Sequence, residues 1–564
     1  MRDAQMALAH WPLASARLWT AKLVAALGRV GGWPLVLWAL LAAGAVAARP
    51  VLAPLETAAL SVVWQAWVPG FAPPGTIDRP PLLVWLIHLL WTLFGVSGAL
   101  ARLVTPAFSL AALLATWRLG RELWPRRPEL AGAAAIVLVG TSGFATYLGL
   151  TVASMPPVPF FALGLIGLAR AAEGAAFRGF SLYATAVLFG CLSGGWAILL
   201  ALLPPAVLAP WWAGAGPTAP RRRWARWYAC TAGSVALAVA LVFLWMWAGG
   251  MDAVTALGRV WTRAGGWWHR SWLWIPALLP LVLYPWVWWP TFWRSVRAAL
   301  LAGPDSGTRF ALVAAAAALL FALLTGNGQA DSLLLLQVPL ALLIARVSAD
   351  QAQPRDFHAL VPGLVALAIG LVAFLLNIVP AAHLDVVWRL VIDEDGSVPI
   401  WLGGISLVPG LLLLGGGYFA ALVTPRETRG ALVQLALLPA LLITSFNLEY
   451  IFTIREFADL QPVANEIRTL QEQGRPVAYY GRYKGQFDFA GRLQAPLVEL
   501  RPMKETLFWA AANPDGVIVS SFQGSVLKLP ARPLLLGPVG DTWAALWTAP
   551  QVLATNGAVL EQQF

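Results

Sequence analysis

Charge and cysteine are scarce in this sequence of 564 residues. Charged side chains make up 12% of the chain, whereas they make up about 25% of an average soluble domain. So little charge cannot cover the surface of a soluble enzyme of this length, and the 59% of hydrophobic residues excludes a disordered chain. Two cysteines, Cys191 and Cys230, are too few for a disulfide framework or a thiolate metal cluster.

The chain is instead rich in long apolar runs, and it contains 31 Trp residues. Trp collects at bilayer interfaces, where its ring meets lipid and its N–H meets water. Thirteen runs are long enough to cross about 30 Å of hydrocarbon, and they lie near 33–48, 99–120, 129–148, 156–171, 180–193, 195–212, 227–248, 272–290, 308–325, 332–346, 357–380, 400–422 and 430–447. We therefore predict an α-helical polytopic membrane protein with about 13 transmembrane helices.

The basic residues that give the net charge of +11 are expected mainly on one side of the membrane. Apart from the segment 249–271, Arg clusters fall in alternate loops, which the positive-inside rule places in the cytoplasm together with the N-terminus. The basic excess therefore predicts contact with membrane lipids and no nucleic acid. A fourteenth apolar segment, 81–97, would turn every later Arg-rich loop outward if it crossed the bilayer. We expect it to lie along the outer interface as an amphipathic or half-sunk helix.

The last long apolar run ends near Phe446, and the rest of the chain has the mixed polar and apolar composition of a soluble domain. Its pattern predicts helices over 457–474 and 504–512 and buried strands over 477–481 and 516–521. Alternating helices and strands are typical of a small α/β domain. We predict a membrane domain over 1–448 and an extracytoplasmic α/β domain over 449–564.

The first outer segment holds the polar residues of greatest interest. Glu56 begins a stretch with helical spacing, and Asp78 and Arg79 precede two prolines that open the segment 81–97. From the residues alone, Glu56 is either a first-turn carboxylate favoured by the helix dipole or a functional acid. Arg79 is either a snorkelling anchor at the headgroups or a functional cation.

Three stretches in this region carry a family resemblance: LETAALSVVWQAW, RPPLLVWLIHLLWTLFGVS and ARLVTPAFSLAALLATWRLGRELW. Their order and spacing resemble the opening of the GT-C superfamily of membrane glycosyltransferases, which includes protein O-mannosyltransferases and lipid A aminoarabinose transferases. The resemblance implies transfer of a sugar from a polyprenyl-phosphate donor to an outer-facing lipid, glycan or protein acceptor. It also implies a bacterial-type inner (plasma) membrane, with the C-terminal domain in the periplasm.

Several charged residues of the family are replaced in this chain. The family has Asp-Glu where this chain has Leu55-Glu56, and it has Arg and Asp where this chain has Thr151 and Pro156. A family Lys-Gly is replaced by Gly194-Gly195, and a basic position by Gln329. The losses fall on the residues expected to perform acid–base chemistry and to bind phosphate.

The remaining matches define the site that the resemblance implies. We predict Glu56, the retained family Glu, as the catalytic carboxylate and Asp78 as its helper, because removal of a proton makes the acceptor hydroxyl a better nucleophile. Arg79 binds the donor phosphate, since fixed cations stabilise the charge that develops on the leaving group. The sequence identifies no definite cofactor; the family chemistry admits a divalent metal ion, whose ligands the sequence does not specify.

The segment 249–271 is an outer loop that is rich in arginine and tryptophan. The family places a phosphate-binding Arg in this region, so we predict Arg263 and Arg270 as further donor ligands, with His269 beside them. Arg holds phosphate oxygens in bidentate geometry. The alternative is an aromatic belt with snorkelling arginines.

Two functions remain open at this point. The first is an active glycosyltransferase that uses a polyprenyl-phosphate sugar. The second is a catalytically degenerate relative that binds a lipid-linked sugar or acts as an assembly subunit. A transporter is less consistent with the sequence, because transport sites need charged residues within the spans and these spans have almost none.

Overall fold

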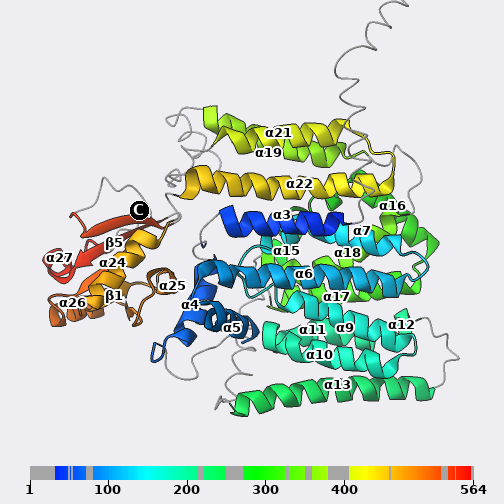
Figure 1. Ribbon diagram of the computed structural model, residues 1–564, viewed down its shortest axis with the longest axis horizontal. Coiled ribbons are helices and arrows are strands. Elements are labelled where there is room, and N and C mark those ends of the chain that lie inside the picture. The colour runs from blue at the N-terminus through cyan, green and yellow to red at the C-terminus, as the bar shows by residue number, and fades with distance from the viewer. Residues whose placement is uncertain are drawn as a thin grey trace, which may run out of the picture.

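A bundle of helices with a small α/β domain at one end forms the molecule (Figure 1). The computed structural model describes residues 32–48, 51, 55–71, 81–213, 221–248, 271–325, 330–349, 358–378, 406–455, 459–522, 531–539 and 542–560. The bundle helices run side by side, and α4 (Leu55–Trp67) and α5 (Leu82–Phe94) lie at the end that faces the α/β domain. We call this end of the bundle the C-domain end.

Seven helical segments of the described chain are long and apolar enough to cross a membrane. They contain α6 (Gly98–Leu123), α10 (Ala176–Gly194), α13 (Arg221–Ala248), α17 (Ser306–Thr325), α18 (Leu334–Ser348), α19 (Leu360–Ile378) and α22 (Thr428–Glu449). Helices satisfy their backbone hydrogen bonds internally, as a bilayer requires. The predicted class of polytopic helical membrane protein is confirmed, whereas the count of thirteen spans stays a prediction.

Shorter apolar helices complete the bundle. They are α3 (Trp33–Ala48), α7 (Glu129–Val139), α8 (Ser142–Tyr147), α9 (Pro157–Ala172), α11 (Leu199–Val207), α12 (Ala209–Trp212), α15 (Ser271–Val282), α16 (Pro290–Ala302) and α21 (Leu407–Leu422). Glycines let some of these helices pack closely: a Cβ added at Gly417 in α21 would lie 2.6 Å from the Leu367 nitrogen in α19. Cys191 and Cys230 are both free.

The segment 81–97 forms the short helix α5. It has 13 residues, so its length is roughly 20 Å at about 1.5 Å per residue. That is well short of the about 30 Å of a hydrocarbon core. This length agrees with the prediction that the segment does not cross the membrane.

The directions of the helices show at which end of the bundle their connecting loops lie. The end of α6 meets the start of α17 where the Trp124 indole donates to Asp305, with 3.2 Å between Nε1 and Oδ2. The Arg346 guanidinium near the end of α18 also reaches Asp305, at 3.1 Å. These contacts lie at the far end of the bundle, because α6 begins beside α4 and α5. The end of α17 and the start of α18 therefore return to the C-domain end.

The C-terminal part of the chain forms a five-stranded sheet in the order β2-β1-β3-β5-β4. Strands β1 (Val477–Tyr480), β2 (Val498–Leu500) and β3 (Val517–Phe522) are parallel, whereas β4 (Leu535–Val539) and β5 (Thr542–Thr548) pair antiparallel. Its helices are α24 (Gln461–Glu472), α25 (Asp488–Gly491), α26 (Met503–Ala512) and α27 (Ala549–Ala554). The predicted α/β class is confirmed; the domain boundary predicted at 448 stays a prediction.

A buried carboxylate joins this α/β domain to α4. Asp488 is fully buried, and its Oδ2 accepts hydrogen bonds from Ser61 Oγ at 2.6 Å and Gln65 Nε2 at 3.1 Å. Its Oδ1 accepts from the Tyr483 hydroxyl at 2.6 Å. Burial and the Asp488 charge raise the pKa of Tyr483 well above its ordinary value, so its hydroxyl stays protonated and donates. Trp64 adds a bond to the Leu493 carbonyl at 2.8 Å.

We expect Gly485→Ala to weaken this docking contact. A Cβ at Gly485 would lie 2.0 Å from Ser61 Oγ on α4, and overpacking of this kind costs typically about 1–3 kcal/mol. Gly474→Ala is the matched control, because the φ of Gly474 is +74°, close to the +75° of Gly485, and nothing lies within 4 Å of its added Cβ. Thermal unfolding in detergent should show a larger loss for Gly485→Ala. Equal losses would mean that backbone strain alone, and not contact with α4, sets the effect.

Candidate carboxylate site at the C-domain end

Glu56 lies in the first turn of α4 and is completely enclosed. Its side chain is 0% exposed, and its Oε1 accepts a hydrogen bond from the Thr151 backbone N–H at 2.8 Å. The Arg102 Nε of α6 lies 3.9 Å from the same oxygen. The start of a helix favours a carboxylate through its dipole. Glu56 therefore ties α4 to the loop between α8 and α9 and to the start of α6.

Arg102 extends this connection to a third helix. Its guanidinium donates to the carbonyl oxygens of Ala45 and Val46 near the end of α3. The side chain is 6% exposed, so the Glu56–Arg102 pair is a buried ion pair. Removal of one partner from such a pair is strongly destabilising, since a charge remains away from water. The pair fixes the relative positions of α3, α4 and α6.

Asp331 is a second carboxylate at the same end of the bundle. It lies in the short helix η4 (Ala330–Leu333), which leads into α18, and it is half-buried. The Ser154 hydroxyl donates to Asp331 Oδ2. Unlike Glu56, Asp331 retains exposed surface.

Both carboxylates contact one short loop between α8 and α9. Glu56 holds Thr151, and Asp331 holds Ser154. Residues three apart lie at most about 11 Å from each other even in an extended chain, so the two acids border a small region. Pro156 and Pro157 end this loop and begin α9, a position that suits their fixed φ and missing N–H.

Sequence reasoning did not identify Asp331. A usable signal was present, because Asp331 is the charged residue in the stretch GNGQADS, two positions after Gln329. The resemblance expects a basic side chain at Gln329, whereas the charged residue of this stretch is acidic and lies two positions later. Asp331 was missed because the resemblance points to another position and to another type of residue.

The other predicted site residues lie outside the described part of the chain. Asp78 and Arg79 fall within 72–80, and Arg263, His269 and Arg270 fall within 249–270. Their positions relative to Glu56 and Asp331 therefore stay predictions. Gln329 also lies outside the described residues.

A metal ion finds no ready ligand set in the described residues. Within the ranges given above, no group of three His, Cys, Asp or Glu side chains could hold a metal ion. Asp331 with one serine hydroxyl offers a single carboxylate.

The fold belongs to a recognisable class. An apolar helical bundle, short helices at one end and an α/β domain beside them form the architecture that the sequence resemblance implies, and this expectation is confirmed for the fold by two solved structures.

Two solved structures show the likeness over nearly the whole chain. The structure of ArnT from Cupriavidus metallidurans bound to undecaprenyl phosphate has a TM-score of 0.65 and 16% identity, and the match covers 96% of this chain and 99% of that one. ArnT from the same organism in the apo state has a TM-score of 0.63 and 15% identity, and the match covers 95% and 99% of the two chains. No protein-family profile and no curated protein matches the sequence.

Proposed function

We propose that this protein is a membrane glycosyltransferase that transfers a sugar from a polyprenyl-phosphate donor to an acceptor at the C-domain end of the bundle. The observation that carries the proposal is the likeness over 96% of the chain to ArnT bound to undecaprenyl phosphate. Two carboxylates at the C-domain end provide acid–base groups for the reaction. The acceptor class, a lipid, glycan or protein, comes from the family resemblance.

The proposed reaction needs a base for the acceptor and cations for the leaving group. A carboxylate takes the proton of the acceptor hydroxyl, whose oxygen attacks the anomeric carbon of the donor sugar. The bond between that carbon and the phosphate oxygen breaks, and polyprenyl phosphate leaves with the electron pair. Cations near the phosphate stabilise this charge. Arg79, Arg263 and Arg270, with His269, are the proposed phosphate ligands, and Asp78 is the proposed helper.

Asp331 is the more exposed of the two carboxylates. Its side chain is half-buried, whereas Glu56 has no exposed surface. We propose that Asp331 takes the proton and that Glu56 positions the loop at Thr151 and the Arg102 side chain. The sequence-based prediction that Glu56 is itself the base stays a prediction, and a comparison of variants at the two positions separates the two roles.

We also propose the orientation that the charge distribution supports. Arg127 and Arg346 lie at the far end of the bundle, with Asp305. Arg retained on that side agrees with the positive-inside rule. The C-domain end then faces the periplasm of a bacterial inner membrane, where a polyprenyl-linked donor and an outer acceptor meet.

A binding protein without transfer activity is the second candidate. It is favoured by Thr151 and Pro156, which are neutral at positions where the resembling family has Arg and Asp. The two candidates differ in turnover. The purified full chain is supplied with a bacterial pool of polyprenyl-phosphate sugars and an outer-leaflet lipid extract, and labelled sugar in the acceptor fraction is measured. Acceptor-dependent transfer supports the enzyme, whereas donor binding without transfer supports the binding protein.

A further inference from the structure

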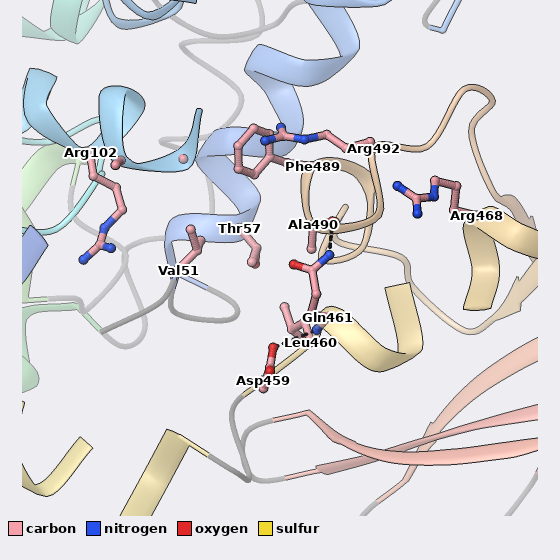
Figure 2. Close-up of a pocket in the computed structure, with 12 residues that line it drawn as sticks. Val51, Thr57, Arg102, Asp459, Leu460, Gln461, Arg468, Phe489, Ala490 and Arg492 are labelled. Carbon is pink, nitrogen blue, oxygen red and sulfur yellow. Dashed lines mark hydrogen bonds between the residues drawn. The ribbon is translucent and has the colours of Figure 1, made fainter. Parts of the chain in front are cut away.

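A cavity of about 370 Å³ lies where the starts of α4 and α6 meet the α/β domain (Figure 2). Its volume falls within the range of about 300–1,000 Å³ that is usual for small-molecule sites. Val51, Leu460 and Phe489 supply apolar wall, and the polar lining comes from Thr57, Gln461, Asp459, Arg102, Arg468 and Arg492. The cavity is thus apolar in part and carries more positive than negative side chains.

Arg492 is held at the cavity by an unusual backbone and by two aromatic rings. Its φ of 53° is in the left-handed region, which non-glycine residues seldom adopt. The guanidinium carbon lies 3.9 Å from the centroid of Phe489 and 5.1 Å from that of Trp64. This packing places the cation in a defined position over the rings, as Figure 2 shows for Phe489.

The Arg492 cation is partly withdrawn from water. Burial lowers its pKa, and its Nη1 is enclosed without a hydrogen-bond partner in the described part of the chain. An anion in the cavity would offset this loss of hydration, because charge-assisted hydrogen bonds strengthen where the local dielectric is low.

Arg468 supplies a second cation from α24. Figure 2 shows its guanidinium directed toward the turn that carries Ala490, with the Arg492 guanidinium on the other side of this turn, over Phe489. Its ion pair with Glu472, at 3.6 Å, involves a carboxylate that is 64% exposed, and pairs of this kind contribute little. Asp459, the acid of the lining, already accepts the Gln461 backbone N–H at 2.9 Å as a local cap.

We propose that this cavity is a second anion site, which binds a phosphate or carboxylate group through Arg468 and Arg492. Its apolar wall and its level at the end of the bundle suit the headgroup of an anionic lipid, and a soluble phosphate is the other source of the same chemistry. The site consists of residues other than the proposed donor ligands, so it does not depend on the proposed transfer reaction.

Equilibrium binding to the full-length protein in neutral detergent tests the site. The probes are radiolabelled phosphatidylglycerol in mixed micelles, the same micelles with phosphatidylcholine, and inorganic phosphate. Arg468→Gln should weaken binding of the anionic probe by roughly 10-fold or more, since one charge-assisted contact is lost. Arg492→Lys keeps the charge but loses the fork geometry and should weaken it by a smaller factor. Arg501→Gln, which removes an exposed charge of the same domain outside the cavity, is the control.

The probes separate the two sources. Saturable binding of phosphatidylglycerol that inorganic phosphate does not displace identifies a lipid headgroup site. Displacement by inorganic phosphate, or direct binding of it, identifies a site for a free phosphate group. Thermal unfolding without ligand checks that the variants fold. Folded Arg468→Gln and Arg492→Lys proteins that bind every probe as tightly as Arg501→Gln would overturn the proposal.

Discussion

Asp331→Asn is expected to lower the rate of sugar transfer by about 10²–10⁴-fold, the usual contribution of a general base. The asparagine keeps the size of the side chain and an oxygen that can accept the Ser154 hydroxyl, so the loop between α8 and α9 should stay in place. What is lost is the ability to take a proton from the acceptor. The effect should fall on the turnover number, with donor affinity nearly unchanged.

Two further variants make this experiment specific. Ser154→Ala removes the hydroxyl that contacts Asp331 but leaves the carboxylate, so its loss of rate should be much smaller. Glu56→Gln replaces the enclosed acid that holds Thr151. If Asp331→Asn transfers sugar normally while a folded Glu56→Gln protein does not, the sequence-based assignment of the base to Glu56 is correct and the role proposed for Asp331 is wrong.

Arg102→Ala is expected to destabilise the protein by about 3–5 kcal/mol, the usual effect when one partner of a buried pair is removed. The substitution removes the positive charge beside the enclosed Glu56 carboxylate and the bonds to the end of α3. Unfolding with increasing denaturing detergent measures the free energy. The substitution should also weaken the packing of α4, because Glu56 lies in the first turn of that helix.

Arg118→Ala on the same helix is the matched control. Arg118 is 43% exposed and pairs with Glu122 one turn away, and such pairs contribute only about 0.3–0.5 kcal/mol. The double variant Glu56→Leu with Arg102→Met should recover part of the lost stability, since it leaves no charge in the buried position. A loss for Arg102→Ala no larger than that for Arg118→Ala would show that the pair is not important for the fold.

The sequence predicted the elements whose signal is local. Apolar runs predicted the helices that include α6, α17 and α18, and amphipathic or buried patterns predicted α24, β1, α26 and β3. The antiparallel pair β4–β5 was not predicted. Its sequence explains why: β4 contains Gly537 and Pro538, and β5 reads TWAALWT, which has no alternation of polar and apolar residues. Pairing with β3 decides the structure of β5.

The candidate site was only partly predictable for a related reason. The resemblance pointed to Glu56, and the helix pattern placed it in a first turn. Its enclosure depends on Thr151, 95 residues later in the chain, and the contact between Ser154 and Asp331 joins residues 177 positions apart. No local sequence pattern indicates contacts between residues so far apart in the chain. Asp331 could be recognised as part of the site only once the helices had brought its loop beside the loop between α8 and α9.

Release of polyprenyl phosphate is the measurement that tests the central claim most directly. The purified protein is mixed with an excess of polyprenyl-phosphate sugar and an acceptor lipid extract, and the free polyprenyl phosphate formed per protein molecule is counted over time. A glycosyltransferase releases many molecules per protein, and release stops without acceptor. Stoichiometric binding of the donor, with no release above the level without protein, would contradict the proposed activity and support a binding protein with this fold.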